Sequence, residues 1–128
     1  VSAIGDGKEP RWSSGKDVPR WTSRPQLGKK QWVEGRFSKP RKVRSVGVYW
    51  MQDQQDVKFP KEWSLEVRSG KEWKPFELYV TDRYDNRANQ YNVVHPAAPL
   101  TCDAIRIHMT PNENSALGIL EVQVAFEE

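Results

Sequence analysis

The chain has 128 residues, a formal net charge of +3 and a composition of 37% hydrophobic and 29% charged residues. Its six tryptophans exclude a disordered chain, because such chains are poor in aromatic residues. Its apolar runs are only a few residues long, which excludes a transmembrane helix. The length fits one domain, and we expect residues 1–128 to be a single domain excised from a larger protein.

The N-terminal part of the chain, up to residue 30, is punctuated by glycine, proline and serine and predicts turns. From residue 31 onward, apolar and polar residues alternate in short segments, which is typical of β-strands wet on one side. The predicted strands cover residues 31–37, 42–50, 63–68, 72–78, 91–95, 102–109 and 117–126. A Ser69-Gly70 turn joins the third and fourth of these into a hairpin.

No segment shows a sustained helical periodicity of 3.6 residues. Many short strands separated by turn signals predict an all-β fold, either an antiparallel β-sandwich or a jelly roll. The long connections at residues 51–60 and 79–90 are then loops at the ends of the sandwich. Binding residues on such folds are usually found in these loops.

The sequence carries no recognisable catalytic motif, and we expect no enzymatic activity. His95 precedes a proline at a strand end, and His108 alternates outward with Arg106, so both are expected to be structural. The single cysteine, Cys102, excludes a disulfide framework and cysteine-based zinc sites, and nothing around it lowers its pKa. Acidic pairs such as those in the two long loops are better explained by solvation than by glycosidase chemistry.

A basic cluster at residues 39–44, preceded by Lys29 and Lys30, raises the possibility of single-stranded nucleic-acid binding. However, 17 acidic residues are spread among the 20 basic ones. Lysine-rich edges also protect β-sheets from pairing with other chains. A solvated turn and strand face is therefore the preferred interpretation, and no nucleic-acid partner is expected.

The tryptophans fall into two groups. Four lie in predicted strands, where a core or packing role is expected: Trp32, Trp50, Trp63 and Trp73. Trp12 and Trp21 instead lie in the turn-rich N-terminal part. An indole ring stacks well on the C–H face of a sugar, and neighbouring polar side chains can bond its hydroxyls. The alternative is that Trp21 closes one end of the sandwich.

Several short motifs occur in the order of a known family. They are Ala3…Asp6-Gly7, Ser13-Ser14…Val18-Pro19-Arg20-Trp21, Gly28…Gln31-Trp32-Val33-Glu34…Phe37, Val46-Gly47-Val48-Tyr49-Trp50, Pro60…Trp63-Ser64-Leu65, Glu72-Trp73-Lys74-Pro75, Tyr91-Asn92-Val93-Val94, Ala104-Ile105-Arg106-Ile107 and Gly118-Ile119-Leu120-Glu121-Val122. In this order the chain resembles the discoidin-like (coagulation factor 5/8 type C) domains that accompany bacterial glycoside hydrolases.

The resemblance implies a jelly roll of about eight strands, of the galactose-binding type. It also implies a non-catalytic carbohydrate-binding module that targets a parent glycoside hydrolase to a glycan. The parent enzyme would be secreted, periplasmic or at the bacterial cell surface, so the implied partners are a glycan and the catalytic domain of the same chain. The alternative is a domain of the same fold that packs against its catalytic partner and binds no sugar.

Many relatives carry a structural calcium ion beside the N-terminal Asp-Gly turn, closed by a glutamate of the last strand. The matching residues are Asp6 and Glu121, and oxygen ligands in a tight turn suit calcium. Lys8 stands where relatives that hold the ion have a second aspartate. Asp6 would otherwise cap its own turn. Ile119 shares the side of Glu121, so we expect that side to be partly covered and the carboxylate to need a partner.

The sugar-contact residues follow from chemistry and loop position, because the binding loops vary most within the family. The candidates are Trp21 as stacking platform, Tyr84 as a second platform, Arg24 and Arg83 as hydroxyl donors, and Asp53 and Asn86 as acceptors. A small polar ligand must compete with its own hydration. We therefore expect dissociation constants from roughly millimolar to tens of micromolar.

Overall fold

The computed structural model describes residues 11–13, 21–22, 30–51, 57–87, 90–112 and 115–127, with the backbone alone for 11–13, 21–22 and 120. Its strands are β1 (Arg11–Ser13), β2 (Trp21–Thr22), β3 (Gln31–Trp50), β4 (Glu62–Ser69), β5 (Glu72–Pro75), β6 (Tyr91–Val94), β7 (Leu100–Thr110) and β8 (Gly118–Phe126). Within these ranges no helix is long and apolar enough to cross a lipid bilayer.

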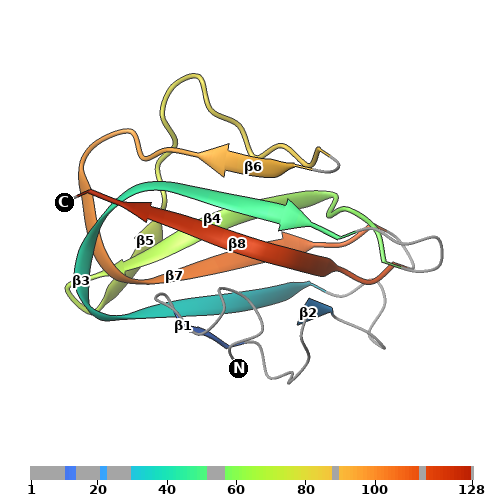
Figure 1. Ribbon diagram of the computed structural model, residues 1–128, viewed down its shortest axis with the longest axis horizontal. Coiled ribbons are helices and arrows are strands. Elements are labelled where there is room, and N and C mark those ends of the chain that lie inside the picture. The colour runs from blue at the N-terminus through green and yellow to red at the C-terminus, as the bar shows by residue number, and fades with distance from the viewer. Residues whose placement is uncertain are drawn as a thin grey trace.

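The strand β3 belongs to both layers of a sandwich. Its first half pairs with β1 and β7, and β4 and β5 continue this first layer. Its second half still pairs with the start of β7 at residues 41–43 and then pairs with β6 and β8, and β2 continues this second layer beyond β8. All of these pairings are antiparallel. Figure 1 shows β3 turning back at the left of the view, so that it begins and ends at the same end of the molecule.

The turn in β3 lies between Arg36 and Arg41, where its register with β7 shifts. Residues 38–40 at the turn are exposed and include Pro40, which has no N–H to donate to a ladder. The two strands predicted for residues 31–37 and 42–50 are therefore one bent strand of 20 residues. The bend folds the sheet over and creates the two layers.

The core lies between the layers and is built by the predicted alternation. Val33, Ile105 and Ile107 of the first layer have no exposed surface, and neither have Val46 and Val48 of the second. This confirms the all-β sandwich. Burying such side chains is the main stabilising contribution, at about 1.5–3 kcal/mol for each large aliphatic residue.

The predicted hairpin between β4 and β5 is confirmed. Ser69 pairs with Glu72, and the two residues between them, Gly70 and Lys71, have φ angles of 60° and 73°. Positive φ at both central residues is the signature of a type I′ turn, whose twist matches that of the flanking strands. The second strand of the hairpin ends at Pro75, earlier than the expected residue 78.

Strand ends gather at one end of the sandwich, which we call the loop end. Here β3 begins and ends, β4 and β8 begin, and β7 ends. The Met51 amide donates to the Gly118 carbonyl at 2.9 Å. A side chain at Gly118 would meet Val57 Cγ1 at 2.8 Å and Met51 Cβ at 3.0 Å, so only glycine allows this approach. The connections that follow β3 and precede β8 are thereby tied together.

Candidate functional site

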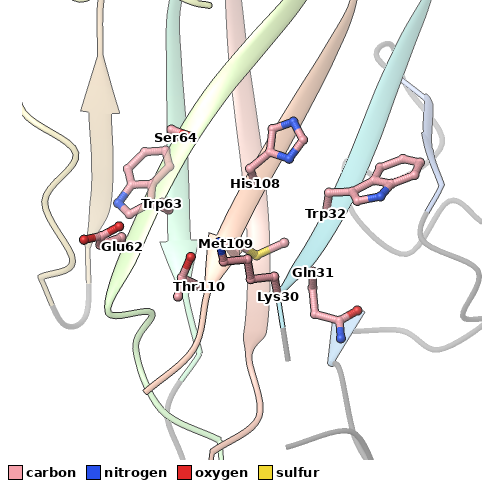
Figure 2. A pocket seen from close by; sticks show the side chains of 9 residues that line it. All are labelled: Lys30, Gln31, Trp32, Glu62, Trp63, Ser64, His108, Met109 and Thr110. Atoms are coloured by element: carbon pink, nitrogen blue, oxygen red, sulfur yellow. The ribbon is translucent and has the colours of Figure 1, made fainter. Parts of the chain in front are cut away.

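A pocket of about 320 Å³ opens at the loop end of the first layer. Figure 2 shows the nine side chains that line it, from the start of β3, the start of β4 and the end of β7. The lining residues are Lys30, Gln31, Trp32, Glu62, Trp63, Ser64, His108, Met109 and Thr110. Because Trp32 pairs with His108 and His108 with Ser64, these three residues form one row across neighbouring strands.

Trp32 is the aromatic feature of this pocket. It lies on the outer face of the first layer, and half of its surface is exposed (50%). Trp63 and Met109 also line the pocket, although both are core residues with 4% and 1% exposure. The pocket therefore combines an accessible indole with an apolar wall fixed by the core.

Polar side chains line the rest of the pocket. Ser64 and Thr110 bring hydroxyl groups, and Lys30 and Glu62 bring charges of opposite sign. His108 Nε2 lies 3.0 Å from Glu66 Oε1, so the imidazole is oriented by a carboxylate. A pocket that has an exposed indole and polar side chains in its lining is suited to a ligand that is apolar on one face and hydroxylated at its edges.

A buried carboxylate supports the strand that carries Trp32. Glu34 is only 4% exposed and accepts a hydrogen bond of 2.8 Å from Arg106 Nε and a second one from Arg36 Nε. Burial alone would raise the pKa of Glu34. The hydrogen bonds and charges of Arg106 and Arg36 outweigh burial, so this pKa lies below its usual value. Glu34 is therefore ionised at neutral pH.

Three of the six predicted sugar-contact residues belong to the N-terminal part of the chain or to the loop after β3. They are Trp21, Arg24 and Asp53. The backbone of Trp21 pairs with Ile119 in β2, which brings it to the start of β8 at the loop end. Its side chain is outside the described part of the structure. Arg24 and Asp53 lie wholly outside the described residues.

The other three lie in the loop after β5, which is anchored beside the pocket. Trp63 Nε1 donates to the Asp85 carbonyl at 2.8 Å, and Asn86 Nδ2 donates to the Pro60 carbonyl at 2.8 Å. The ring of Tyr84 contacts that of Trp63 edge to face at 4.8 Å. Arg83 is exposed. The loop after β5 therefore lies at the loop end, and it is held there by Trp63, which also lines the pocket.

Tyr84 has a structural role in addition to any contact with ligand. Its hydroxyl accepts from the Leu65 amide at 3.2 Å and donates to the Phe76 carbonyl at 3.4 Å. Burial raises the pKa of Tyr84 above its usual value, since the charged form would lose its hydration. A tyrosine held in this way fixes the loop on β4, and its use as a sugar platform stays a prediction.

The four strand tryptophans, expected to have a core or packing role, divide between the core and the outer face. Trp50 and Trp63 are buried, as expected, with their ring centroids 5.3 Å apart. Trp32 and Trp73 lie instead on the outer face and are partly exposed. The signal was present in the alternation: Trp32 has the parity of Glu34 and Arg36, opposite to buried Val33.

Glu121, the predicted calcium ligand, is exposed, so the expected cover on its side is wrong. The register of β8 with β3 shifts by one residue between Glu121 and Ile119, which lets Ile119 and Val122 both point inward. The hydroxyl of Tyr91 donates to Glu121 Oε2 at 2.7 Å. Among the described residues no group of three or more His, Cys, Asp or Glu side chains could hold a metal, and Asp6 lies outside them.

The groups considered for catalysis have structural partners. His95 Nδ1 lies 3.0 Å from Asp82 Oδ2 at the surface. Cys102 is buried in the core, and burial raises the pKa of its thiol to about 11. A thiol with this pKa is protonated at neutral pH and is a poor nucleophile.

The fold is shared with carbohydrate-binding modules of known structure, whereas no curated protein sequence matches the chain. A chain of the Streptococcus pneumoniae beta-galactosidase BgaA is 22% identical with a TM-score of 0.72, over 99% of this chain and 84% of that one. The family 32 module of Clostridium perfringens NanJ, solved with galactose, is 17% identical with a TM-score of 0.66, over 98% and 82%.

A third structure, the family 32 carbohydrate-binding module of S. pneumoniae EndoD, is 19% identical with a TM-score of 0.63, over 98% of this chain and 84% of that one. These modules have the galactose-binding type of β-sandwich, which agrees with the two layers joined by β3. The model of the F5/8 type C domain matches residues 2–122, nearly the whole sequence. The chain therefore belongs to the F5/8 type C domain family.

Proposed function

We propose that this domain is a non-catalytic carbohydrate-binding module that holds a parent glycoside hydrolase at its glycan. The observation that carries the proposal is the half-exposed Trp32, set in a polar-lined pocket at the loop end of an F5/8 type C domain. Sugars combine an apolar C–H face with a rim of hydroxyl groups, and the pocket offers a partner for each. We place the parent enzyme outside the bacterial cytoplasm, where polymeric glycans are met.

The solved neighbours support this class of ligand. The NanJ module was solved with galactose, and two related structures are of a chitosan-binding module from a Paenibacillus enzyme. Sequence identities of 16–18% to these three modules leave the sugar open. The loop residues Trp21, Arg24, Asp53, Arg83, Tyr84 and Asn86 remain our candidates for the contacts that select it.

The test is affinity electrophoresis of the domain through gels containing galactan, xylan, mannan, glucan or chitosan. We expect at least one polysaccharide to retard the domain, and Trp32→Ala to remove the retardation. Lys58→Ala is a matched control, because Lys58 is exposed and does not line the pocket. Free migration of the unmodified domain in every gel would contradict carbohydrate binding.

A second candidate function is docking onto the catalytic domain without sugar binding. Three large apolar side chains on or beside β6 favour it: Val80 is 88% exposed, Tyr79 50% and Val93 44%. Tyr79 is tied to the end of β6, since its amide donates to the His95 carbonyl at 2.9 Å. Exposed apolar groups of this kind are common in interfaces.

The two candidate functions can be distinguished by measuring both docking and sugar retardation in two variants. Val80→Ser with Val93→Ser should weaken co-purification with the parent catalytic domain if these residues dock, and should leave sugar retardation unchanged. Trp32→Ala should do the reverse if the pocket binds sugar. A domain that docks but is retarded by no polysaccharide would establish the second candidate in place of the first.

A further inference from the structure

Two tryptophan rings on the outer face both contact the guanidinium group of one arginine. The guanidinium carbon of Arg106 lies 4.7 Å from the ring centroid of Trp32 and 4.0 Å from that of Trp73. These residues come from β3, β7 and β5, and β4 lies between the last two. Because both rings are near the same atom, they are neighbours although their strands lie three positions apart in the sheet. Both rings are partly exposed.

The arginine between the rings is held in place. Arg106 Nε donates to Glu34 Oε1 at 2.8 Å, and the same carboxylate is held from its other side by Arg36. Glu34 is buried, so this anchor is shielded from water. A planar group fixed between two rings keeps both in position before any ligand arrives, which reduces the entropy lost on binding.

Basic and acidic side chains on this face lie close together and largely offset one another's charge. Arg68 forms two hydrogen bonds with Asp103, of 2.9 and 3.1 Å, and His108 lies 3.0 Å from Glu66. The pKa of Asp103 is lowered, chiefly by its hydrogen bond from Arg68, so this pair is ionised at neutral pH. A face with compensated charges has no field that would attract a charged polymer. Its chemistry fits a neutral ligand.

The two tryptophans belong to different rows of the outer face. Trp32 lies in the row of Ser64, and Trp73 pairs with Arg68 four residues further along β4. At about 3.3 Å per residue, the backbones of these rows are roughly 13 Å apart. The side chains converge on Arg106, so the two ring centroids, at 4.7 and 4.0 Å from the same carbon, are less than 9 Å apart. The pocket lies beside Trp32, and Trp73 lies beyond Arg106 away from the loop end. The Arg106 guanidinium lies between the two rings, and a short chain of sugars can extend past it from one tryptophan to the other.

We propose that the ligand is a neutral oligosaccharide of several units that lies across the outer face of the first layer. One unit occupies the pocket at Trp32, and a later unit stacks on Trp73. This inference rests on the proposed function and adds a second subsite and a ligand class to it. The domain then binds glycan chains, and its affinity depends on the number of sugar units in the chain.

The test is calorimetric titration of the 128-residue domain with neutral oligosaccharides of one to six units from the cello-, xylo-, manno- and galacto- series. For the series that binds, we expect the affinity to rise about tenfold or more between one unit and six. Trp73→Ala should abolish this rise and leave the affinity for one unit unchanged within about twofold. Lys74→Ala, on the same strand, is the control and should keep the rise.

A second measurement uses only the unmodified domain, so its result does not depend on whether a variant folds correctly. In the unmodified domain, the indole N–H resonance of Trp73 should shift with the hexasaccharide and stay in place with the monosaccharide. The inference is overturned if affinity does not change with length. It is also overturned if Trp73→Ala weakens one unit and six units equally, since Trp73 would then only hold Arg106.

Two further outcomes separate the inference from the function on which it rests. Tighter binding of polygalacturonate or heparin than of any neutral chain, with a steep dependence on salt, would overturn the neutral ligand but keep carbohydrate binding. If no sugar of any length or charge binds, the proposed function fails and the second subsite fails with it.

Discussion

Glu34 and Arg106 face each other across β3 and β7, with Arg106 Nε 2.8 Å from Glu34 Oε1, on what is otherwise the outer face of the sheet. A buried carboxylate is unusual there, and it is tolerated because Arg36 provides a second hydrogen bond. The pair links the stability of the first layer to the position of the exposed tryptophans.

We predict that Glu34→Gln lowers the free energy of unfolding by about 2 kcal/mol at pH 7, because two guanidinium groups lose their charged partner. The pKa of Glu34 is lower in the folded state than the ordinary value of about 4.3. Its contribution is therefore present above that pH and is lost as the pH falls through the folded-state pKa. Urea titrations of both proteins between pH 7 and pH 3 should converge. A difference that stays constant with pH would contradict this account.

Two tryptophans that line the same pocket should respond differently to truncation. Trp63→Ala should lower the free energy of unfolding by about 3–5 kcal/mol, because it leaves a cavity beside Trp50 and frees the loop at Asp85. Trp32→Ala should cost no more than about 1 kcal/mol, since half of its surface is already in water. Thermal denaturation checks both, and an equal loss would mean that Trp32 is a core residue.

The buried thiol gives a chemical probe of the core. We predict that Cys102 does not react with a disulfide reagent at pH 8 in the native domain and reacts fully in urea, because its pKa is raised to about 11 by burial. The unfolded chain loses this proton above about pH 8.5, so stability should decline as the pH rises from there. Rapid labelling of the native domain would show that β7 opens easily.

The calcium site stays a prediction. Its two expected ligands are Glu121, which the structure describes, and Asp6, which lies outside the described residues. Glu121 Oε2 accepts from Tyr91, and its other oxygen makes no hydrogen bond to a described residue. If calcium binds, the melting temperature should be higher in millimolar calcium than in chelator, by mass action. Glu121→Gln should remove the difference. Equal melting temperatures with and without calcium would exclude the site.

The sequence predicted most of the fold, because its core follows a period of two. Val33, Val46 and Ile105 could each be assigned to the inner face from alternation alone. Alternation could not show that residues 31–50 form one strand, since a bend is decided by pairing with β7 on one side and β8 on the other. Alternation also failed at Glu121, because a one-residue irregularity in β8 between Ile119 and Glu121 changes which side chains point inward.

The site was predictable only in part. The sequence indicated the loop after β5, and the structure brings Tyr84 and Asn86 of that loop to the loop end. Trp32 was missed as a binding candidate because every tryptophan in a strand was assigned a core or packing role without regard to its parity. The meeting of Trp32 and Trp73 on Arg106 could not be foreseen, since it depends on the order of strands in the sheet.

The most direct test of the account is to follow the indole N–H resonances of the six tryptophans while a binding neutral oligosaccharide is added. The resonance of Trp32 should move the most, and that of Trp73 should follow with longer chains, while that of the buried Trp50 stays nearly fixed. If saturating sugar moved neither Trp32 nor Trp73, ligand binding on the outer face of the first layer would be contradicted.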